Sequence, residues 1–270
     1  MSRLLSIHFH KAPALRSRHA VDAIGEYRIW SHLAIRDLRV RYSRTRLGPW
    51  WSAVAQGALI LGIAIATALI AQQPVRDYLP RIAVSLLVWT FVSNIFLESI
   101  DLFTIERGLL LNTRISELSL AMRVVWRQVL LSCYNLPVVI VCVLVGGAAP
   151  SLELFLLPLA ILITSIGLVL PSFIIGILTL FRRDFGQLIP SMVQLLFFVS
   201  PVMWQTPSTG RLNLLSSVNP IAWILEAIRE LVLSDGVTPL AQIRWLVLIG
   251  ALAFSAALTS PVIKHIRLRI

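Results

Sequence analysis

Charged residues are scarce in this chain of 270 residues, and acidic residues especially so. Only 14% of its residues are charged, against about 25% in a typical soluble domain, and just 13 are Asp or Glu. Apolar residues make up 57% of the chain, more than a single soluble core would bury. This composition argues against a soluble enzyme, a disordered tail or a secreted disulfide scaffold, and it predicts an integral membrane protein.

Motifs for nucleotide hydrolysis and for catalysis are also absent from the sequence. A phosphate-binding P-loop needs Gly-Lys followed by Ser or Thr, but neither Lys11 nor Lys264 follows a glycine. There is no Ser-His-Asp or HExxH arrangement, and the apolar runs hold no series of acids suited to a proton relay. Cys133 and Cys142 are nine helical steps apart and so face opposite ways. We therefore expect no catalytic residue, no metal site and no cofactor in this chain.

Long uncharged runs fill most of the sequence. About 20 such residues cross the hydrocarbon core of a bilayer, and six segments predict an all-α membrane protein with six transmembrane helices: 49–71, 81–103, 128–147, 154–180, 187–203 and 244–263. Glu98 and Asp101 end the second segment, and we expect them at the membrane boundary, because an ion at mid-bilayer costs about 2.5–3.5 kcal/mol or more.

The basic residues predict the orientation of these spans. The chain has 24 Lys and Arg residues, and most of them lie before the first span, between the second and third spans, and after the last one. Loops rich in Lys and Arg stay in the cytoplasm. We therefore expect both termini to be cytoplasmic.

Residues 26–46 predict an amphipathic helix that leads into the first span. On a helical wheel its apolar face gathers four residues within about 80°: Tyr27, Trp30, Ala34 and Leu38. A basic helix with such a face lies in the plane of the inner leaflet. It is either a simple anchor or a place where Arg36, Arg39 and Arg41 meet an anionic lipid headgroup.

The fifth span combines amides and an aromatic residue on one face. Five residues lie within about 60° on a helical wheel: Gln187, Ser191, Gln194, Phe198 and Gln205. The opposite face is apolar: Leu188, Ile189, Met192, Leu195, Leu196 and Val199. A polar stripe in a membrane helix faces another helix or a cavity. Both interhelical hydrogen bonding and the lining of a pathway for sugars remain open.

Three stretches of the sequence have distinctive residue patterns: RDLRVRYSRTRLGPWW (36–51), FRRDFGQLIPSMVQLLFFVSPVMW (181–204) and NPIAWILEAIRELVL (219–233). Together they resemble the type-2 ABC exporter permeases of the polysaccharide branch, which export O-antigen, capsule, teichoic acid and related cell-wall glycans. The similarity extends over residues 25–265. Pro49 is a small departure, because many relatives have an aliphatic residue there.

The resemblance implies one ABC-2 transmembrane domain over residues 1–270, in a bacterial inner membrane. It implies a homodimer with two copies of a separate ATPase subunit that binds ATP and Mg. A cytoplasmic coupling helix in 104–123 would dock that ATPase through Glu106, Arg107, Asn112 and Arg114. Short re-entrant helices would occupy the external segment 204–243.

The resemblance also implies the cargo, a glycan on a polyprenyl diphosphate, which enters near the amphipathic helix among the membrane lipids. Nucleic acid is not an expected partner. The glycan would then cross a channel at the dimer axis, for which the candidate lining residues are Trp89, Phe96, Gln187, Ser191, Gln194, Phe198 and Trp204. Two alternatives remain: an ABC-2 permease for a small drug or lipid, and a polytopic membrane enzyme or secondary transporter.

Overall fold

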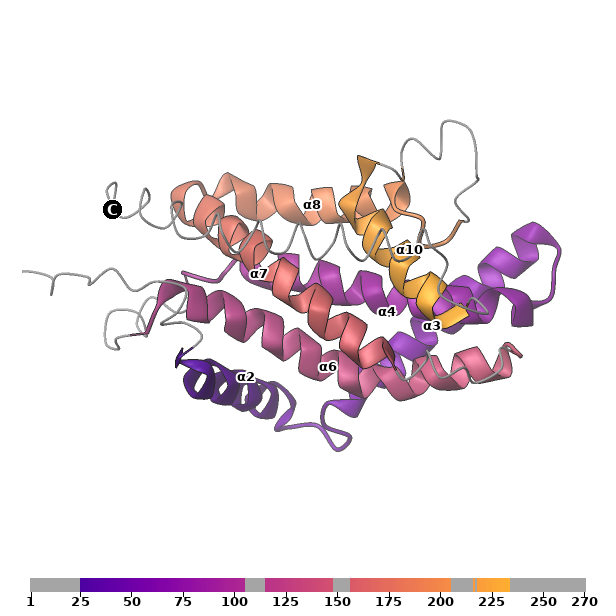
Figure 1. Cartoon of the computed structure of the whole chain (residues 1–270), viewed down its shortest axis with the longest axis horizontal. Helices are drawn as coiled ribbons and strands as arrows, with labels where there is room; N and C mark the ends of the chain where they lie inside the picture. Colours follow the sequence, from indigo (N-terminus) through magenta and orange to yellow (C-terminus); the bar gives the residue numbers. More distant parts are fainter. Residues whose placement is uncertain (1–24, 105–114, 148–155, 205–215, 217, 234–270) are drawn as a thin grey trace, which may run out of the picture.

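The computed structural model describes residues 25–104, 115–147, 156–204, 216 and 218–233. The described residues form seven helices (Figure 1): α2 (Tyr27–Tyr42), α3 (Trp50–Ala71), α4 (Val75–Ser99), α6 (Glu117–Val145), α7 (Leu157–Phe181), α8 (Asp184–Val199) and α10 (Pro220–Leu233).

Length and composition determine which of these helices can cross a bilayer. At 1.5 Å per residue, α3, α4, α6 and α7 each exceed the hydrocarbon thickness of about 30 Å, and they are the four candidate spans among the described residues. Helix α8 is apolar but has 16 residues, which gives about 24 Å. The all-α membrane class is confirmed. The total of six spans stays a prediction, and the sixth, 244–263, lies outside the described residues.

Helix α4 is the centre of the bundle. It packs against α3, α6, α7, α8 and α10, and its middle turns, from Leu86 to Trp89, are buried. Helix α6 approaches it closely at its end, where a Cβ added at Gly146 would collide with the ring of Pro80. The bundle therefore leaves α4 little lipid-facing surface, although its composition alone is that of an ordinary span.

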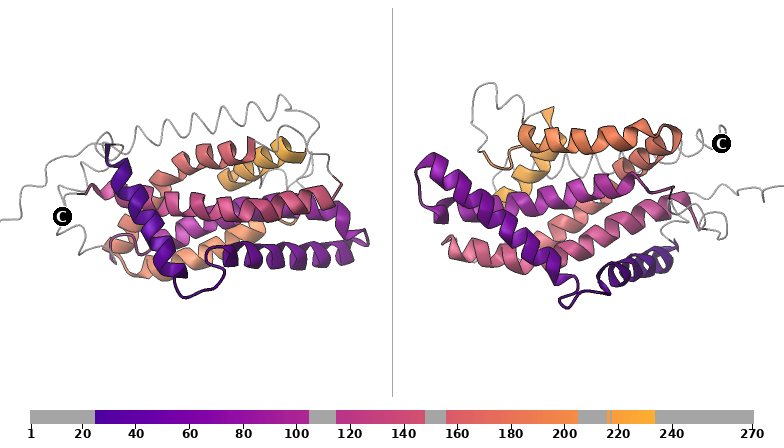
Figure 2. Two further views of the ribbon diagram at one scale, coloured as in Figure 1. Left: turned by 90° about the horizontal axis from the view of Figure 1, so that it is seen from below. Right: turned by 180° about the vertical axis from the view of Figure 1, so that it is seen from behind.

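Helix α2 lies across the start of α6 (Figures 1 and 2). The predicted apolar face is present, but it packs on protein: Ala34 and Leu38 are buried, and Trp30 meets Trp126 of α6 edge to face with ring centroids 5.9 Å apart. Periodicity identifies an apolar face and not what covers it. The placement of this helix in the inner leaflet stays a prediction.

Helix α6 begins at Glu117, eleven residues before the predicted third span. Its N-cap is Ser116, whose Oγ accepts a hydrogen bond from the backbone N–H of Ser119, the contact that N-cap serines provide. The segment 104–123, predicted as the loop that holds the coupling helix, therefore overlaps the start of α6. Its remaining part, 105–114, lies outside the described residues together with Glu106, Arg107, Asn112 and Arg114.

The end of α4 is held by α7. The hydroxyl groups of Ser99 and Ser172 are 2.7 Å apart, and Thr179 Oγ1 donates a hydrogen bond of 2.7 Å to the carbonyl of Ile100. Gly176 of α7 lies so close to the chain leaving α4 that an added Cβ would be 2.8–2.9 Å from atoms of Leu102. These contacts fix the segment that leads into residues 105–114.

Candidate functional site

Asp37 of α2 binds two arginines of α6. Arg123 donates from Nε to Asp37 Oδ2 at 2.7 Å and from Nη2 to Oδ1 at 2.8 Å, which is the bidentate pairing that guanidinium groups favour. Arg127 donates from Nη1 to Asp37 Oδ2 at 2.9 Å. The two arginines are four residues apart and so share one face of α6. Asp37 is thereby fixed against α6.

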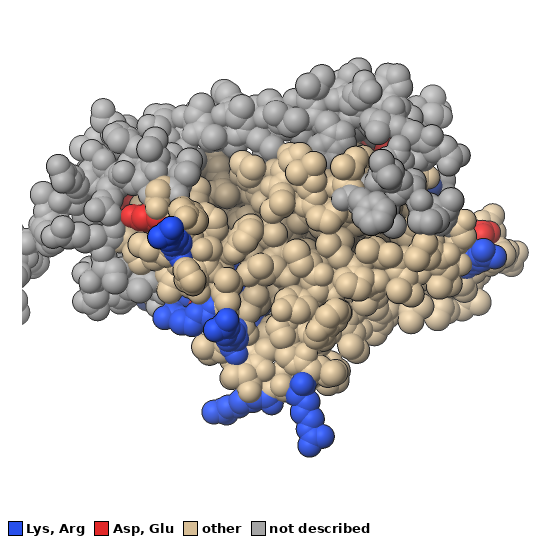
Figure 3. Space-filling view, turned by 60° about the horizontal axis from the view of Figure 1, so that its bottom comes forward, with Lys and Arg blue, Asp and Glu red and all other residues tan. Residues whose placement is uncertain are grey.

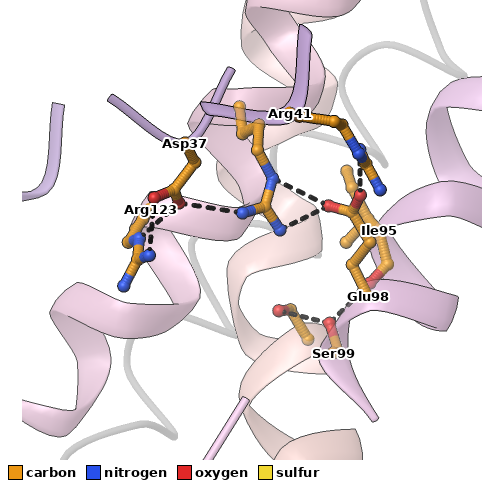
Figure 4. A network of polar contacts seen from close by, with 8 residues as sticks. Asp37, Arg41, Ile95, Glu98, Ser99 and Arg123 are labelled. Carbon is orange, nitrogen blue, oxygen red and sulfur yellow. Dashed lines mark hydrogen bonds and ion pairs between the residues drawn. The ribbon is translucent and has the colours of Figure 1, made fainter. Parts of the chain in front are cut away.

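Arg127 extends this arrangement to α4. Its Nε and Nη2 donate to Oε2 of Glu98 at 3.0 and 2.6 Å, and Arg41 of α2 donates from Nη1 to Oε1 of the same carboxylate at 2.8 Å. We call Asp37, Arg41, Glu98, Arg123 and Arg127 the ion-pair network (Figure 4). It joins three helices, and its three arginines exceed its two carboxylates by one positive charge.

The two parts of the network differ in burial and therefore in strength. The side chains of Arg123 and Asp37 are 7% and 14% exposed, and removing one partner of a buried pair costs about 3–5 kcal/mol. The Arg41 side chain is 51% exposed, and an exposed ion pair contributes only about 0.2–1 kcal/mol. The network thus consists of firm contacts of α6 with α2 and, through Arg127, with α4, and of a weak direct contact between α2 and α4.

Glu26 makes a further contact between the start of α2 and the start of α6. Its Oε2 accepts hydrogen bonds from the backbone N–H of Ser116 at 3.0 Å and from Ser119 Oγ at 2.7 Å. A carboxylate at a helix N-terminus satisfies free N–H groups and is favoured by the helix dipole. Both ends of the segment 105–114 are therefore bonded to α2, the start of α6 through Glu26 and the end of α4 through Glu98.

The three predicted headgroup arginines are not equivalent. Arg41 belongs to the ion-pair network, Arg36 lies 3.9 Å from Asp37 with a largely exposed side chain, and Arg39 is exposed. Figure 3 shows basic side chains gathered on one part of the face where α2 lies, beside a broad uncharged surface. The sequence indicated the basic face of α2, but it did not indicate that Arg41 is paired.

The predicted polar stripe of the fifth span is present on α8 and faces away from the bundle. Gln187, Ser191, Gln194 and Phe198 are all exposed, and Phe198 is 67% exposed; we call these four residues the α8 stripe. On the opposite, apolar face, Leu188, Met192 and Leu195 are exposed as well, while Ile189 is buried together with Val193. Gln205 lies outside the described residues.

The structure separates the remaining channel candidates from the stripe. Trp89 of α4 is buried beneath Phe197, with ring centroids 5.3 Å apart, and Phe96 is half-buried against the same core. Trp204 is half-buried, and its Nε1 donates a hydrogen bond of 3.4 Å to the carbonyl of Phe198. This hydrogen bond joins Trp204 to the stripe through Phe198.

A second polar cluster lies where α10 meets the end of α8. Arg229 of α10 is 7% exposed; its Nη2 donates to Ser85 Oγ at 2.6 Å and also to the carbonyl of Pro201. Asn219 Nδ2 donates to Ser200 Oγ at 2.8 Å. A guanidinium stays charged in proteins, and a cation is favoured at a helix C-terminus. The short helix α10 therefore holds the end of α8 and the chain that leads to Trp204.

Sequence reasoning missed most of these contacts. The pair Arg123 and Arg127, four residues apart at the start of an apolar run, was the available signal for a shared acidic partner. No local pattern indicated the partners of Arg229, because Ser85 and Pro201 are distant in sequence. Within the described ranges no group of three or more His, Cys, Asp or Glu side chains is placed to hold a metal ion, and both cysteines are free.

Comparison with known families gives this arrangement a context. Residues 29–233, well over half of the chain, match the family described as ABC-2 type transporter. No curated protein matches the chain. Members of the matched family are the membrane permeases of ABC transporters, which work with an ATPase subunit. The chain therefore belongs to the ABC-2 type transporter family.

Proposed function

We propose that this permease exports a lipid-linked polysaccharide across the bacterial inner membrane. The cargo class is O-antigen, capsule, teichoic acid or cell-wall galactan, carried on a polyprenyl diphosphate. The permease acts as a homodimer with two copies of an ATPase subunit that binds ATP and Mg. Its termini are cytoplasmic, and the ion-pair network lies at the cytoplasmic end of the bundle.

The observation that carries this proposal is the exposure of the α8 stripe. Gln187 and Gln194 are exposed on an apolar helix, and amide groups that face lipid without partners are costly. A second copy or a hydrated pathway removes this cost. Amides together with an aromatic ring also suit a sugar chain, because weak contacts at many places allow the chain to move. A permease for a small drug or lipid has no need of an extended stripe.

Docking of the ATPase is proposed for residues 105–114, through Glu106, Arg107, Asn112 and Arg114. The two flanks of this segment are the end of α4, held by α7 through Ser99, and the start of α6, held by Glu26. Movement of the docked ATPase would reach α4, α6 and α2 together, because these contacts join the three helices. Lipid-linked cargo would enter beside Arg36, Arg39 and Arg41.

The first test is dependence on the partner. The purified chain is expected to show no ATP hydrolysis. The complex with its ATPase, reconstituted in vesicles, is expected to hydrolyse ATP faster when a polyprenyl-diphosphate-linked glycan is present. Hydrolysis by the chain alone would contradict the assignment to a permease. Stimulation by a small amphipathic drug, with no response to the glycan, would favour the alternative cargo.

The second test addresses the α8 stripe. We expect Phe198→Ala to lower glycan export about fivefold, because one aromatic contact contributes about 1 kcal/mol, and Gln194→Leu to lower it similarly. The control is Ile166→Ala on α7, an apolar residue that is 62% exposed and outside the stripe. Export is measured in reconstituted vesicles after assembly of each complex has been verified. Unchanged export in both stripe variants would remove the α8 stripe from the pathway.

A further inference from the structure

Arg41 occupies an unusual position in the ion-pair network. It lies in the last turn of α2, and its bond to Glu98 is the ion pair that joins α2 directly to α4 among the described residues. The Arg41 side chain is half exposed, whereas that of Glu98 is 15% exposed. The contact is made by one nitrogen and one oxygen, Nη1 and Oε1, so the other terminal nitrogen of Arg41 is available to a ligand.

Departure of Arg41 leaves no buried charge without a partner. Glu98 keeps Arg127, which donates two hydrogen bonds to its Oε2. Helix α2 keeps its contacts with α6, because Asp37 remains bonded to Arg123 and Arg127. The structure thus contains one ion pair that can open while the rest of the network stays closed.

The surroundings of Arg41 favour an anion that competes with Glu98. Arg39, Arg44 and Arg46 are exposed nearby in sequence. In the described residues 25–48 the acids are Glu26 and Asp37, and both are already bonded to α6. A guanidinium binds phosphate oxygens in a bidentate manner and more strongly than neutral acceptors. A phosphate group at this surface meets several cations and no exposed carboxylate of this segment.

The level of this surface relative to the membrane indicates that the phosphate belongs to a lipid headgroup. Trp50 and Trp51, which begin α3, are about half exposed, and tryptophan is enriched at the level of lipid headgroups. The arginines precede them by a few residues, where the headgroup phosphates lie.

We propose that a phosphate-bearing lipid headgroup binds Arg41 and displaces it from Glu98, so that the end of α4 loses its direct bond to α2 while Arg127 still joins Glu98 to Asp37. The inference rests on the proposed function for its link to transport, since α4 leads into the proposed docking segment 105–114. Arrival of a headgroup at α2 would thereby change the freedom of one flank of that segment before ATP is hydrolysed.

The test measures two distances by electron spin resonance in the complex of the permease with its ATPase, without ATP, in phosphatidylcholine nanodiscs. Nitroxide labels at positions 40 and 101 report on α2 and α4, because both positions are exposed; this version carries Cys133→Ala and Cys142→Ala. Labels at position 40 and at the natural Cys133, which is exposed on α6, report on α2 and α6; this version carries Cys142→Ala. The added probes are a polyprenyl diphosphate, phosphatidylglycerol or inorganic pyrophosphate.

We expect a phosphate probe to broaden the distance distribution between positions 40 and 101 and to leave the distance between positions 40 and 133 unchanged. Glu98→Gln, which removes the charge that holds Arg41, is expected to produce the same broadening without any probe. The matched control is Arg182→Gln, which removes an exposed positive charge at the end of α7 and touches neither the network nor the cations beside Arg41. It is expected to keep both the starting distance and the response.

The outcomes identify which molecule supplies the phosphate and show whether Arg41 is displaced at all. A response to the polyprenyl diphosphate alone identifies the cargo, a response to phosphatidylglycerol identifies bulk lipid, and a response to pyrophosphate identifies free phosphate; each supports displacement of Arg41. No response to any probe overturns the proposal, as does an equal change in the distance between positions 40 and 133. Failure of glycan export with an intact distance response would refute the proposed cargo and leave the displacement of Arg41 standing.

Discussion

Replacing Asp37 with asparagine is expected to lower the free energy of unfolding by about 3–5 kcal/mol, the cost of leaving a buried charge without its partner. The amide would keep the shape of the side chain but would present no negative charge to Arg123 and Arg127, which donate three hydrogen bonds to Asp37. Helix α2 would lose its firm contact with α6. Thermal unfolding of the purified protein in detergent measures the effect.

Two companion variants test whether stability is lost because a buried charge is left without its partner or because any charge on α2 has been removed. Arg36→Gln removes an exposed cation 3.9 Å from Asp37 and is expected to change stability by less than about 1 kcal/mol. Asp37→Leu combined with Arg123→Met removes both members of the buried pair and leaves Arg127 with Glu98. It is expected to recover much of the lost stability, since apolar replacement of a buried pair is often neutral. Equal losses in all three variants would contradict the account of the network.

Periodicity predicted the helices well and their partners poorly. The apolar residues of α2 lie on one face, as the sequence indicated, yet Ala34 and Leu38 pack on α6. The α8 stripe also lies on one side of its helix, while Leu188 and Met192 on the opposite, apolar side are exposed as well. A repeat of 3.6 residues defines sides of a helix, but which side is covered depends on elements far away in the sequence.

Charge marked the uncharged part of the third span and not the start of its helix. The predicted third span begins at residue 128, where the uncharged run begins after Arg123 and Arg127. In the folded chain both are paired with Asp37, which is 86 and 90 residues away in sequence. The helix therefore extends back to Glu117. A single sequence carries no record of a pairing over that distance.

The contacts of α2 and α7 at the two flanks of segment 105–114 support the proposal that the ATPase docks there. One flank, at the end of α4, is bonded to α7 through Ser99 and to α2 through Glu98. The other flank, at Ser116, is bonded to Glu26 of α2. A displacement of the segment is therefore passed to two helices before it reaches the middle of the bundle. The weak member of this set is the Arg41 contact, and a close approach at the α4 flank is that of Gly176 to Leu102.

Gly176→Ala is expected to disturb this packing directly. The added Cβ would lie 2.8 Å from Cδ2 and 2.9 Å from Cβ of Leu102, and 3.0 Å from Cε2 of Phe103, so the chain leaving α4 must move. Overpacking of this kind costs about 1–3 kcal/mol. Because Leu102 and Phe103 lead into the proposed docking segment, we also expect the glycan-stimulated part of ATP hydrolysis to be lost in the reconstituted complex.

Gly62→Ala is the matched control, because it makes the same substitution within a helix where an added Cβ meets no atom of another element within 4 Å. Its effect on stability is expected to be favourable by up to about 1 kcal/mol, since alanine is the better helix former, and stimulation by the glycan should persist. Both variants are compared at a temperature where each remains folded, so that loss of coupling is not confused with unfolding. Normal stimulation in Gly176→Ala would mean that the contact between α7 and the end of α4 serves packing alone, and that the ATPase acts on the bundle through the α6 flank.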